Sequence, residues 1–333
     1  MGPATRNRLT SPCIHSAVTT AGVLFALIAS FALIARYIPI RNHLTVFATA
    51  LFPFISLTGL VSIVFFAAAR RWILAAISCV VLAVSLAVTV PLYVPAATPG
   101  ASVPVRVITA NVYLGQADTD TLVAAALQDA DLLAVQELTP QSADRITAGL
   151  SGAFPHRVTD ARDQAGGVGL WSRYPLVDPQ RIAGYEMAMV ASQLRIAGVA
   201  DDPTVIVAHI SGPWPQAIDD WQRDMKQMAQ TMQDADRNSP AGTVIVMGDF
   251  NSTLDMWQFR NLLREGYRDA AQQAGSGSIP TYPGDRAVPP IIAIDHVITK
   301  RGTAADVSAI VLPGSDHRGL RATINVPRSP GLP

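Results

Sequence analysis

The sequence predicts an N-terminal region of three transmembrane helices followed by a single mixed α/β domain. Half of its 333 residues are hydrophobic and only 15% are charged, which is too apolar for a wholly water-soluble protein of this length. The apolar residues are concentrated between Ser16 and Val94, where charged residues are few. From Val105 onward, short β-rich runs alternate with helical stretches. These observations indicate a lipid-exposed region and a globular region in one chain.

Three apolar spans cover residues 17–38, 44–69 and 72–94, and each is close to the ~20 residues that a helix needs to cross the hydrocarbon core. Helices are expected because lipid offers the backbone no hydrogen-bond partners. A cleaved signal peptide is the alternative for the first span, but it leaves the other two unexplained. The spans contain no Asp, Glu or Lys, so they predict an anchor and not a transport path.

Arginines near the span ends favour one orientation. Two precede the first span and two separate the second from the third: Arg6, Arg8, Arg70 and Arg71. Three spans place both pairs on the same side, which the positive-inside rule makes cytoplasmic. Arg36 and Arg41 in the first loop weaken this bias. We therefore expect a multi-pass protein of the cell membrane whose globular domain is extracytoplasmic.

The predicted boundaries follow from these changes in composition. A cytoplasmic N-terminal segment covers residues 1–16, and the three transmembrane helices lie within 17–94. Residues 95–104 (PAATPGASVP) form a linker whose Pro and small residues suit a short tether. The globular domain covers 105–327, and 328–333 form a tail.

Charge and cysteine content limit the possible functions. The formal net charge is zero, so the usual electrostatic signature of a protein that binds duplex nucleic acid is missing. Nucleic acid remains a possible partner without a basic patch, and no feature indicates a protein partner. The two cysteines, Cys13 and Cys79, lie outside the globular domain, so neither a disulfide nor a zinc site is predicted there.

Polar side chains recur at the ends of predicted strands in the globular domain. They are Asn111, Glu137, His209, Asp249, Asn251, Asp316 and His317. Polar groups that repeatedly terminate strands tend to meet at one edge of a sheet. We therefore expect these side chains to form one site.

These residues lie in a series of short motifs, in the order ITAN, AVQEL, GVGLWSRYPL, IVAHISGP, MGDFN, AIDHV and SDHRG. The series resembles the endonuclease/exonuclease/phosphatase superfamily, which includes DNase I, AP endonucleases, neutral sphingomyelinases and inositol-polyphosphate phosphatases. The resemblance covers nearly all of 105–327. It implies a four-layer, DNase I-like fold, in which a two-sheet β-sandwich is flanked by helices on both outer faces.

Hydrolysis of a phosphoester needs a cation on the phosphoryl oxygens and a positioned water. Glu137 is the best candidate for a Mg²⁺ ligand, because it is a lone carboxylate at the end of a buried apolar strand. The alternative is an ordinary surface acid. Asn111 is a second candidate, unless it is only a turn residue. The resemblance places Asp316 near the metal, which could also be Mn²⁺.

The resemblance also implies catalytic roles. Asp249 and Asn251 in GDFN would orient the attacking water and a phosphate oxygen, although a turn that caps a helix is the alternative. Asp295 would hold His317 in the required tautomer. His209 would donate to a non-bridging oxygen or to the leaving group. Whether Asp249 or His317 activates the water stays open.

Three further residues are less certain from sequence. A lone histidine after a strand is more often structural, and only its place in the motif series favours a catalytic role for His209. Trp214, in GPWP, is a candidate substrate contact or a core residue. His296 follows Asp295, and alternation along a strand turns it to the opposite face, so we predict a packing role.

The architecture narrows the substrate further. Three helices followed by an outward-facing domain of this kind resemble membrane proteins of the VanJ type, which are linked to dephosphorylation of undecaprenyl pyrophosphate. We therefore favour a phospholipid or a polyprenyl pyrophosphate, since an anchor raises the local concentration of a lipid substrate. A metal-dependent nuclease is the alternative, and a non-catalytic binding module is a third hypothesis that the complete motif series disfavours.

Overall fold

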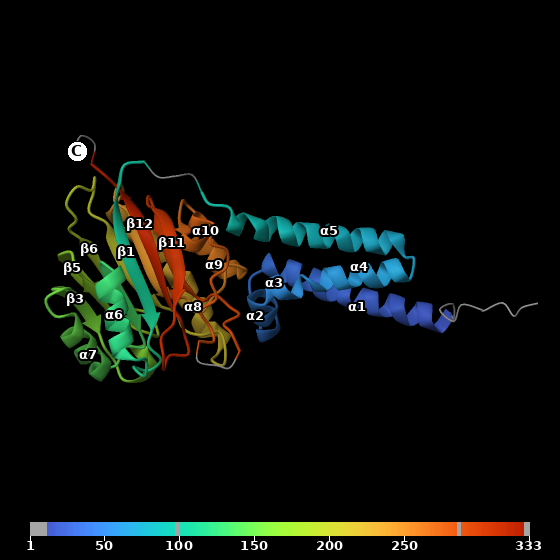
Figure 1. The fold of residues 1–333 in the computed structure, drawn as a ribbon, viewed down its shortest axis with the longest axis horizontal. Coiled ribbons are helices and arrows are strands. Elements are labelled where there is room, and N and C mark those ends of the chain that lie inside the picture. Colours follow the sequence, from blue (N-terminus) through green and yellow to red (C-terminus); the bar gives the residue numbers. More distant parts are fainter. Residues whose placement is uncertain (1–11, 97–99, 285–287, 330–333) are drawn as a thin grey trace, which may run out of the picture. The chain divides into compact units, whose positions relative to one another are not determined.

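The computed structural model describes residues 12–96, 100–284 and 288–329 (Figure 1). The chain divides into a helical unit that ends at Val90 and an α/β unit that begins at Pro91. A short loop, Arg41–His43, groups with the α/β unit. Arg6 and Arg8, on which the predicted orientation partly depends, lie outside the described residues.

Among the described residues, the helical unit contains five helices. They are α1 (Pro12–Arg36), α2 (His43–Ala50), α3 (Phe52–Ile55), α4 (Thr58–Ala68) and α5 (Trp72–Thr89), and a 3₁₀ turn, η2 (Val90–Tyr93), follows. Ile14–Arg36 and Trp72–Tyr93 are each long and apolar enough to cross a membrane. The stretch between them is bent by 74° where α2 meets α3, so it counts as a third span only if the bent pair crosses as one. Pro53, in the first turn of α3, explains the break, because proline cannot continue the hydrogen bonding of a preceding helix.

The helical unit carries its apolar side chains on the outside. Leu27, Val64 and Ile73 are 62%, 60% and 79% exposed, whereas Ala32 and Ser62 are fully buried. This distribution is the reverse of that in a water-soluble bundle, and small residues at helix contacts are typical of helices that pack in lipid.

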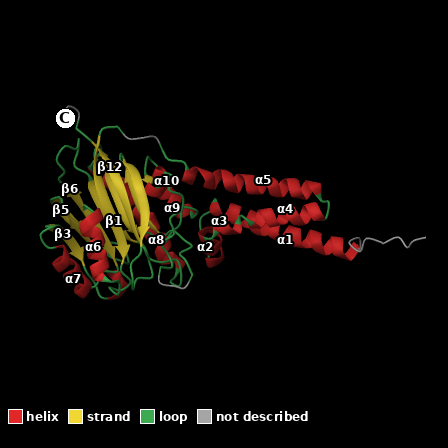
Figure 2. Ribbon diagram, viewed as in Figure 1, coloured by secondary structure: helices red, strands yellow, loops and turns green. Residues whose placement is uncertain are grey.

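The α/β unit contains two six-stranded sheets (Figure 2). The first has the order β11-β12-β1-β2-β4-β3, with β1 (Ser102–Asn111), β2 (Leu132–Gln136), β3 (His156–Asp160), β4 (Val168–Ser172), β11 (Thr303–Ile310) and β12 (Gly319–Pro327). The second has the order β5-β6-β7-β8-β10-β9, with β5 (Leu176–Arg181), β6 (Val190–Leu194), β7 (Thr204–His209), β8 (Val244–Asp249), β9 (Arg268–Asp269) and β10 (Asp295–Lys300).

The two sheets pack face to face around one apolar core. Val107 of β1, Val207 of β7 and Met247 of β8 belong to this core and are fully buried. Helices α6 (Thr119–Asp129) and α7 (Pro140–Leu150) cover the outer face of the first sheet, where Leu122 and Ile146 join a second buried cluster. The remaining elements are α8 (Ile218–Asn238), α9 (Trp257–Leu262), α10 (Ala270–Ala274) and a 3₁₀ turn, η3 (Gln164–Gly166). The predicted two-sheet sandwich with flanking helices is confirmed.

Strand pairing explains why the predicted site residues can meet. β1 runs parallel to β2, and β7 runs parallel to β8, so each pair ends at the same edge. His209 is aligned with Asp249 at the end of the second pair. β10 is antiparallel to β8 and begins there, with Asp295 opposite Asp249. The strand ends of both sheets therefore deliver polar side chains to one edge of the sandwich.

Candidate active site

Asp249 lies at the centre of the candidate site. Its carboxylate is 1% exposed, and its Oδ2 accepts a hydrogen bond of 3.1 Å from Nδ2 of Asn111. The Nε2 atoms of His209 and His317 lie 3.9 and 3.8 Å from the same oxygen. Its Oδ1 accepts a hydrogen bond of 2.8 Å from the backbone N–H of Asn251. One buried carboxylate thus gathers four of the predicted residues.

Glu137 joins this group through the amide of Asn111. Asn111 Nδ2 donates to Glu137 Oε1 over 3.1 Å as well as to Asp249, while Asn111 Oδ1 accepts from the backbone of Tyr113. The backbone N–H of Leu114 donates to Glu137 Oε2 over 2.8 Å. Glu137 has a φ of 55°, a left-handed conformation that is unfavourable for a residue with a side chain. The local hydrogen bonds therefore hold Glu137 in a strained position that directs its carboxylate toward the site.

His317 lies beside Asp295, the residue to which the resemblance assigns an orienting role. Its Nδ1 lies 2.9 Å from Asp295 Oδ2, which leaves Nε2 facing Asp249. The loop that carries His317 is fixed by Ser315, whose hydroxyl accepts from His317 N and donates to the backbone carbonyl of Asn111. This arrangement fixes the ring plane of His317 at the end of β1.

The electrostatics of the site raise the pKa values of both Asp249 and His317. The pKa of Asp249 is raised to about 6, first by burial and then by the negative charge of Asp295, against the lowering effect of His317 and His209. Burial alone would lower the pKa of His317, but the carboxylates of Asp295 and Asp249 outweigh it and raise this pKa to about 10. At neutral pH Asp249 is therefore ionised and His317 is protonated.

Asn251 follows Asp249 in a tight loop. It has a φ of 47°, and its Nδ2 donates to the backbone carbonyl of Ile210 over 2.9 Å. The loop depends on Gly248, where a Cβ atom would lie only 1.8 Å from the carbonyl oxygen of Ala208. Glycine is required there because β7 approaches the backbone so closely.

Motif reasoning missed a buried acid that bonds to the segment just after His209. Asp224 of α8 is fully buried, and its Oδ2 accepts from the hydroxyl of Ser211, two residues after His209, over 2.7 Å. Asp224 Oδ1 and His209 Nδ1 are buried and lack a hydrogen-bond partner among the described residues. A signal was present, because Asp224 lies on the otherwise apolar face of α8 that contains Trp221, Met225, Met228 and Met232.

The other predicted residues occupy the surroundings of this group. Asp316 precedes His317, its negative charge helps to raise the pKa of that histidine, and its backbone carbonyl accepts from Gly284 N. Trp214 is 55% exposed on the loop after β7. The loop passes close to Asn251, because a Cβ atom on Gly212 would lie 3.6 Å from Asn251 Oδ1.

His296 faces away from the site, as strand alternation predicts. The predicted packing role leaves out the hydrogen bonds that its ring forms. Its Nδ1 lies 2.8 Å from Asp269 Oδ2, and its Nε2 lies 2.8 Å from the backbone carbonyl of Ser252. Both ring nitrogens thus take part in buried hydrogen bonds.

The side chains present fit a divalent cation. Carboxylate oxygens of Asp249 and Asp295 lie within 4.8 Å of each other, and Glu137 is linked to Asp249 through one amide. Asp295 Oδ1 is buried without a hydrogen-bond partner among the described residues, which is unfavourable unless a cation or donor satisfies it. Carboxylate oxygens are the ligands that Mg²⁺ prefers. The compact group differs from the predicted ligand set of Glu137, Asn111 and Asp316, whose metal-binding role stays a prediction.

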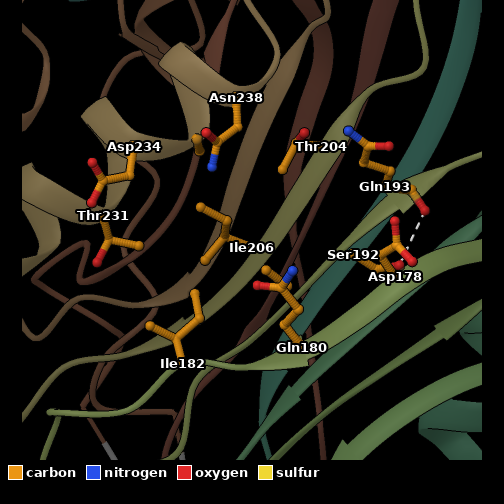
Figure 3. Close-up of a pocket in the computed structure, with 12 residues that line it drawn as sticks. Asp178, Gln180, Ile182, Ser192, Gln193, Thr204, Ile206, Thr231, Asp234 and Asn238 are labelled. Atoms are coloured by element: carbon orange, nitrogen blue, oxygen red, sulfur yellow. Dashed lines mark hydrogen bonds between the residues drawn. The ribbon is translucent and has the colours of Figure 1, made fainter.

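A cavity of about 270 Å³ lies elsewhere, between the strands β5 to β7 and helix α8 (Figure 3). Asp178, Gln193, Asp234 and Asn238 are among the side chains that line it. The described lining includes neither a basic side chain nor any of the predicted site residues. Its chemistry therefore does not suit a phosphate group.

Comparison with known proteins gives one matching protein family. The Endonuclease/Exonuclease/phosphatase family matches residues 108–317, which contain all the predicted site residues. No curated protein matches the sequence.

Solved structures share the fold of the α/β unit. TDP2 from D. rerio, complexed with a single-strand DNA product, is 18% identical with a TM-score of 0.55, over 67% of this chain and 99% of that one. The 3′ phosphatase NExo from Neisseria, bound to a product DNA hairpin, is 18% identical with a TM-score of 0.54, over 66% and 98%. An endonuclease/exonuclease/phosphatase from Beutenbergia cavernae is 16% identical with a TM-score of 0.54, over 69% and 73%.

Proposed function

This chain belongs to the endonuclease/exonuclease/phosphatase family, and on that premise we propose that it is a membrane-anchored, metal-dependent phosphoester hydrolase that acts on a phosphorylated lipid. The observation that carries the proposal is the convergence on Asp249. Asn111, His209 and His317, from three separate strand ends or loops, each approach its Oδ2 within 4 Å. Glu137 is joined to the same group through Asn111.

The residues divide the chemistry between them. Asp249, ionised at neutral pH, accepts a hydrogen bond from the attacking water and so orients it. His317 has its Nδ1 directed at Asp295 and its Nε2 directed into the site, so a protonated ring donates to a phosphoryl oxygen as negative charge develops. His209 is the second donor, to a non-bridging oxygen or to the leaving group. Asn251 and Trp214 are proposed to contact the substrate.

Glu137, with carboxylate oxygens of the Asp249 and Asp295 group, would hold Mg²⁺ or Mn²⁺. A cation bound there would neutralise negative charge on the phosphoryl oxygens and so open the phosphorus atom to attack by water. Asn111 keeps the carboxylates of Glu137 and Asp249 apart at fixed positions by donating to both. Preorganised donors of this kind lose no energy to reorientation during the reaction.

Exposed apolar side chains around the site support a lipid substrate. Leu114 is 38% exposed and donates its N–H to Glu137. Ile291 is 42% exposed and donates its N–H to the backbone carbonyl of Tyr282, whose ring centroid lies 5.1 Å from that of His317. Trp214 is 55% exposed on the loop that approaches Asn251. Apolar side chains gathered at a site favour hydrocarbon, whereas a nucleic-acid site is expected to be strongly basic.

The helical unit supports membrane anchoring. Two unbroken apolar helices and one bent pair are long and apolar enough to cross a bilayer, which supports a multi-pass anchor. Residues 94–101 connect the last apolar helix to β1, and at ~3.3 Å per extended residue they reach less than roughly 30 Å. We propose that the α/β unit works at the outer face of the membrane on a VanJ-type substrate, a polyprenyl pyrophosphate or a related phospholipid.

A nuclease is the second candidate. It is favoured by two structural neighbours whose structures contain DNA, the TDP2 complex with a single-strand product and NExo with a product hairpin. The fold is common to both activities, so the substrate has to be tested directly.

Purified full-length protein in detergent is assayed in parallel on undecaprenyl pyrophosphate, phosphatidic acid and plasmid DNA, with Mg²⁺ or with EDTA. Asp249→Asn serves as the inactive control. The proposal expects phosphate release from a lipid that requires the cation and is lost in the variant. Nicking of plasmid without turnover of either lipid would establish the nuclease instead.

A further inference from the structure

His296 forms two buried hydrogen bonds behind the candidate site. It lies on β10 directly after Asp295, with its ring on the opposite face of the sheet. Nδ1 lies 2.8 Å from Asp269 Oδ2, and Nε2 lies 2.8 Å from the carbonyl oxygen of Ser252. His296 is 3% exposed, Asp269 1% and Ser252 0%, so water does not compete for these bonds.

The two acceptors determine what the ring must do. A backbone carbonyl can only accept, so the Nε2 atom of His296 carries a hydrogen and donates it to Ser252. Asp269 is fixed as well, because its Oδ1 accepts from Gln272 N and caps the start of α10. The imidazole packs against the Phe259 ring at 4.2 Å between centroids and near the Phe250 ring at 6.0 Å. Both bonding and packing hold the ring in one orientation.

The bonded carbonyl belongs to the loop that carries the site's central residues. Ser252 directly follows Asn251, whose left-handed backbone donates to Asp249. The other end of this loop is tied to the same region by the hydrogen bond from Phe250 N to Ile294 O over 2.9 Å. The start of β10 and the residue before it thus bond to the Asp249–Ser252 loop at two points. One bond is made by the Ile294 backbone and the other by the His296 side chain.

We propose that His296 is a positioning residue for the hydrolysis, which fixes the Asp249–Asn251 loop relative to the His317–Asp295 pair through its bond to Ser252. The inference rests on the proposed function, because it assigns the loop a part in catalysis. An apolar ring would also fill the space beside Phe259. Burying the two ring nitrogens of His296 there is favourable only when both are hydrogen-bonded. The bonds therefore specify a geometry that packing alone does not.

The test uses the full-length protein in detergent with Mg²⁺ and bis(4-nitrophenyl) phosphate as the probe. His296→Phe keeps the ring contact but removes both bonds, His296→Gln keeps one donor, and Asp269→Asn keeps the helix cap. We expect kcat per folded molecule to fall about 10- to 100-fold in His296→Phe and less in His296→Gln. KM should change less than kcat, because Trp214, a proposed substrate contact outside this loop, is untouched.

Lys300→Met is the matched control. It removes the 2.8 Å ion pair with Asp236 at the far end of the same strand. We expect it to lower the melting temperature while leaving the hydrogen bonds of the Asp249–Ser252 loop unchanged. A kcat within about twofold of wild type in both His296→Phe and Asp269→Asn overturns the proposal. The proposal is also overturned if Lys300→Met lowers kcat as much as His296→Phe does at an equal fall in melting temperature. If His296→Phe does not fold, His296→Gln and Asp269→Asn decide.

Hydrogen exchange separates this inference from the proposed function. The peptide that covers residues 248–253 should exchange faster in His296→Gln than in wild type, whether or not the probe is a substrate. Unchanged exchange overturns the positioning role. A wild-type protein that hydrolyses neither the probe nor any phosphoester removes the proposed function, while the exchange result still decides whether His296 holds the loop.

Discussion

Replacing Asp295 with asparagine tests the His317–Asp295 pair directly. The substitution preserves the shape of the side chain but removes the negative charge that lies 2.9 Å from His317 Nδ1. Asp295 is also the largest contributor among the groups that raise the pKa of His317. We therefore expect the pKa of His317 to fall in the variant, toward the range of an ordinary histidine.

The effect on stability has a definite sign. The pKa of His317 is raised from 6.5 to about 10 in the folded protein, so between these values the folded state binds more protons than the unfolded chain. The stabilisation is complete below pH 6.5 and is lost as the pH rises toward 10. One proton corresponds to about 1.4 kcal/mol per pH unit within this window, or roughly 3–6 °C in melting temperature for a unit of 150–250 residues.

The assay follows melting by tryptophan fluorescence in detergent with EDTA, from pH 6.5 to 10, for wild type and Asp295→Asn. The melting temperature of wild type should fall across the whole pH range. That of the variant should stop falling in the upper half of the range, because its His317 is already neutral there. Asp202→Asn, which removes a surface ion pair with Arg195, is the control and should keep the wild-type slope. A variant that melts with the wild-type slope throughout would refute the assignment of Asp295 as the partner of His317.

Four other predictions follow from the same structure. Glu137→Gln should lower turnover by at least tenfold and raise the Mg²⁺ concentration needed for half-maximal rate, and an unchanged metal dependence would remove Glu137 as a ligand. EDTA should abolish turnover and Mg²⁺ or Mn²⁺ should restore it, whereas indifference to the chelator would contradict a metal role. Gly248→Ala should destabilise the α/β unit by on the order of 3 kcal/mol, because its Cβ would collide with the carbonyl oxygen of Ala208, and an unchanged melting temperature would show that β7 can shift. A phosphatase reporter fused after Pro327 should be active only outside the cytoplasm, and activity inside would reverse the proposed orientation.

Much of the fold could be predicted because its signals are local. Apolar spans of about 20 residues identify helices for lipid, and apolar runs that end in Asn111, Glu137 or Asp249 identify strands with polar ends. The bend between Ala50 and Phe52 changed the expected second span into a broken pair. The sequence contained its cause, Pro53, but the angle depends on how the neighbouring helices pack.

Sequence alone selected the candidate site residues and placed them at strand ends, since hydrophobic periodicity and residue type are properties of short segments. Only the tertiary structure decided which of these residues form hydrogen bonds with one another. Asn111 meets Asp249 across 138 positions, and His296 meets Ser252 across 44. Periodicity specifies which face of a strand is buried, but the partner on that face depends on the order of the strands and on packing between distant segments. For that reason the bonding partners of Asp224 and His296 became visible only in the folded chain.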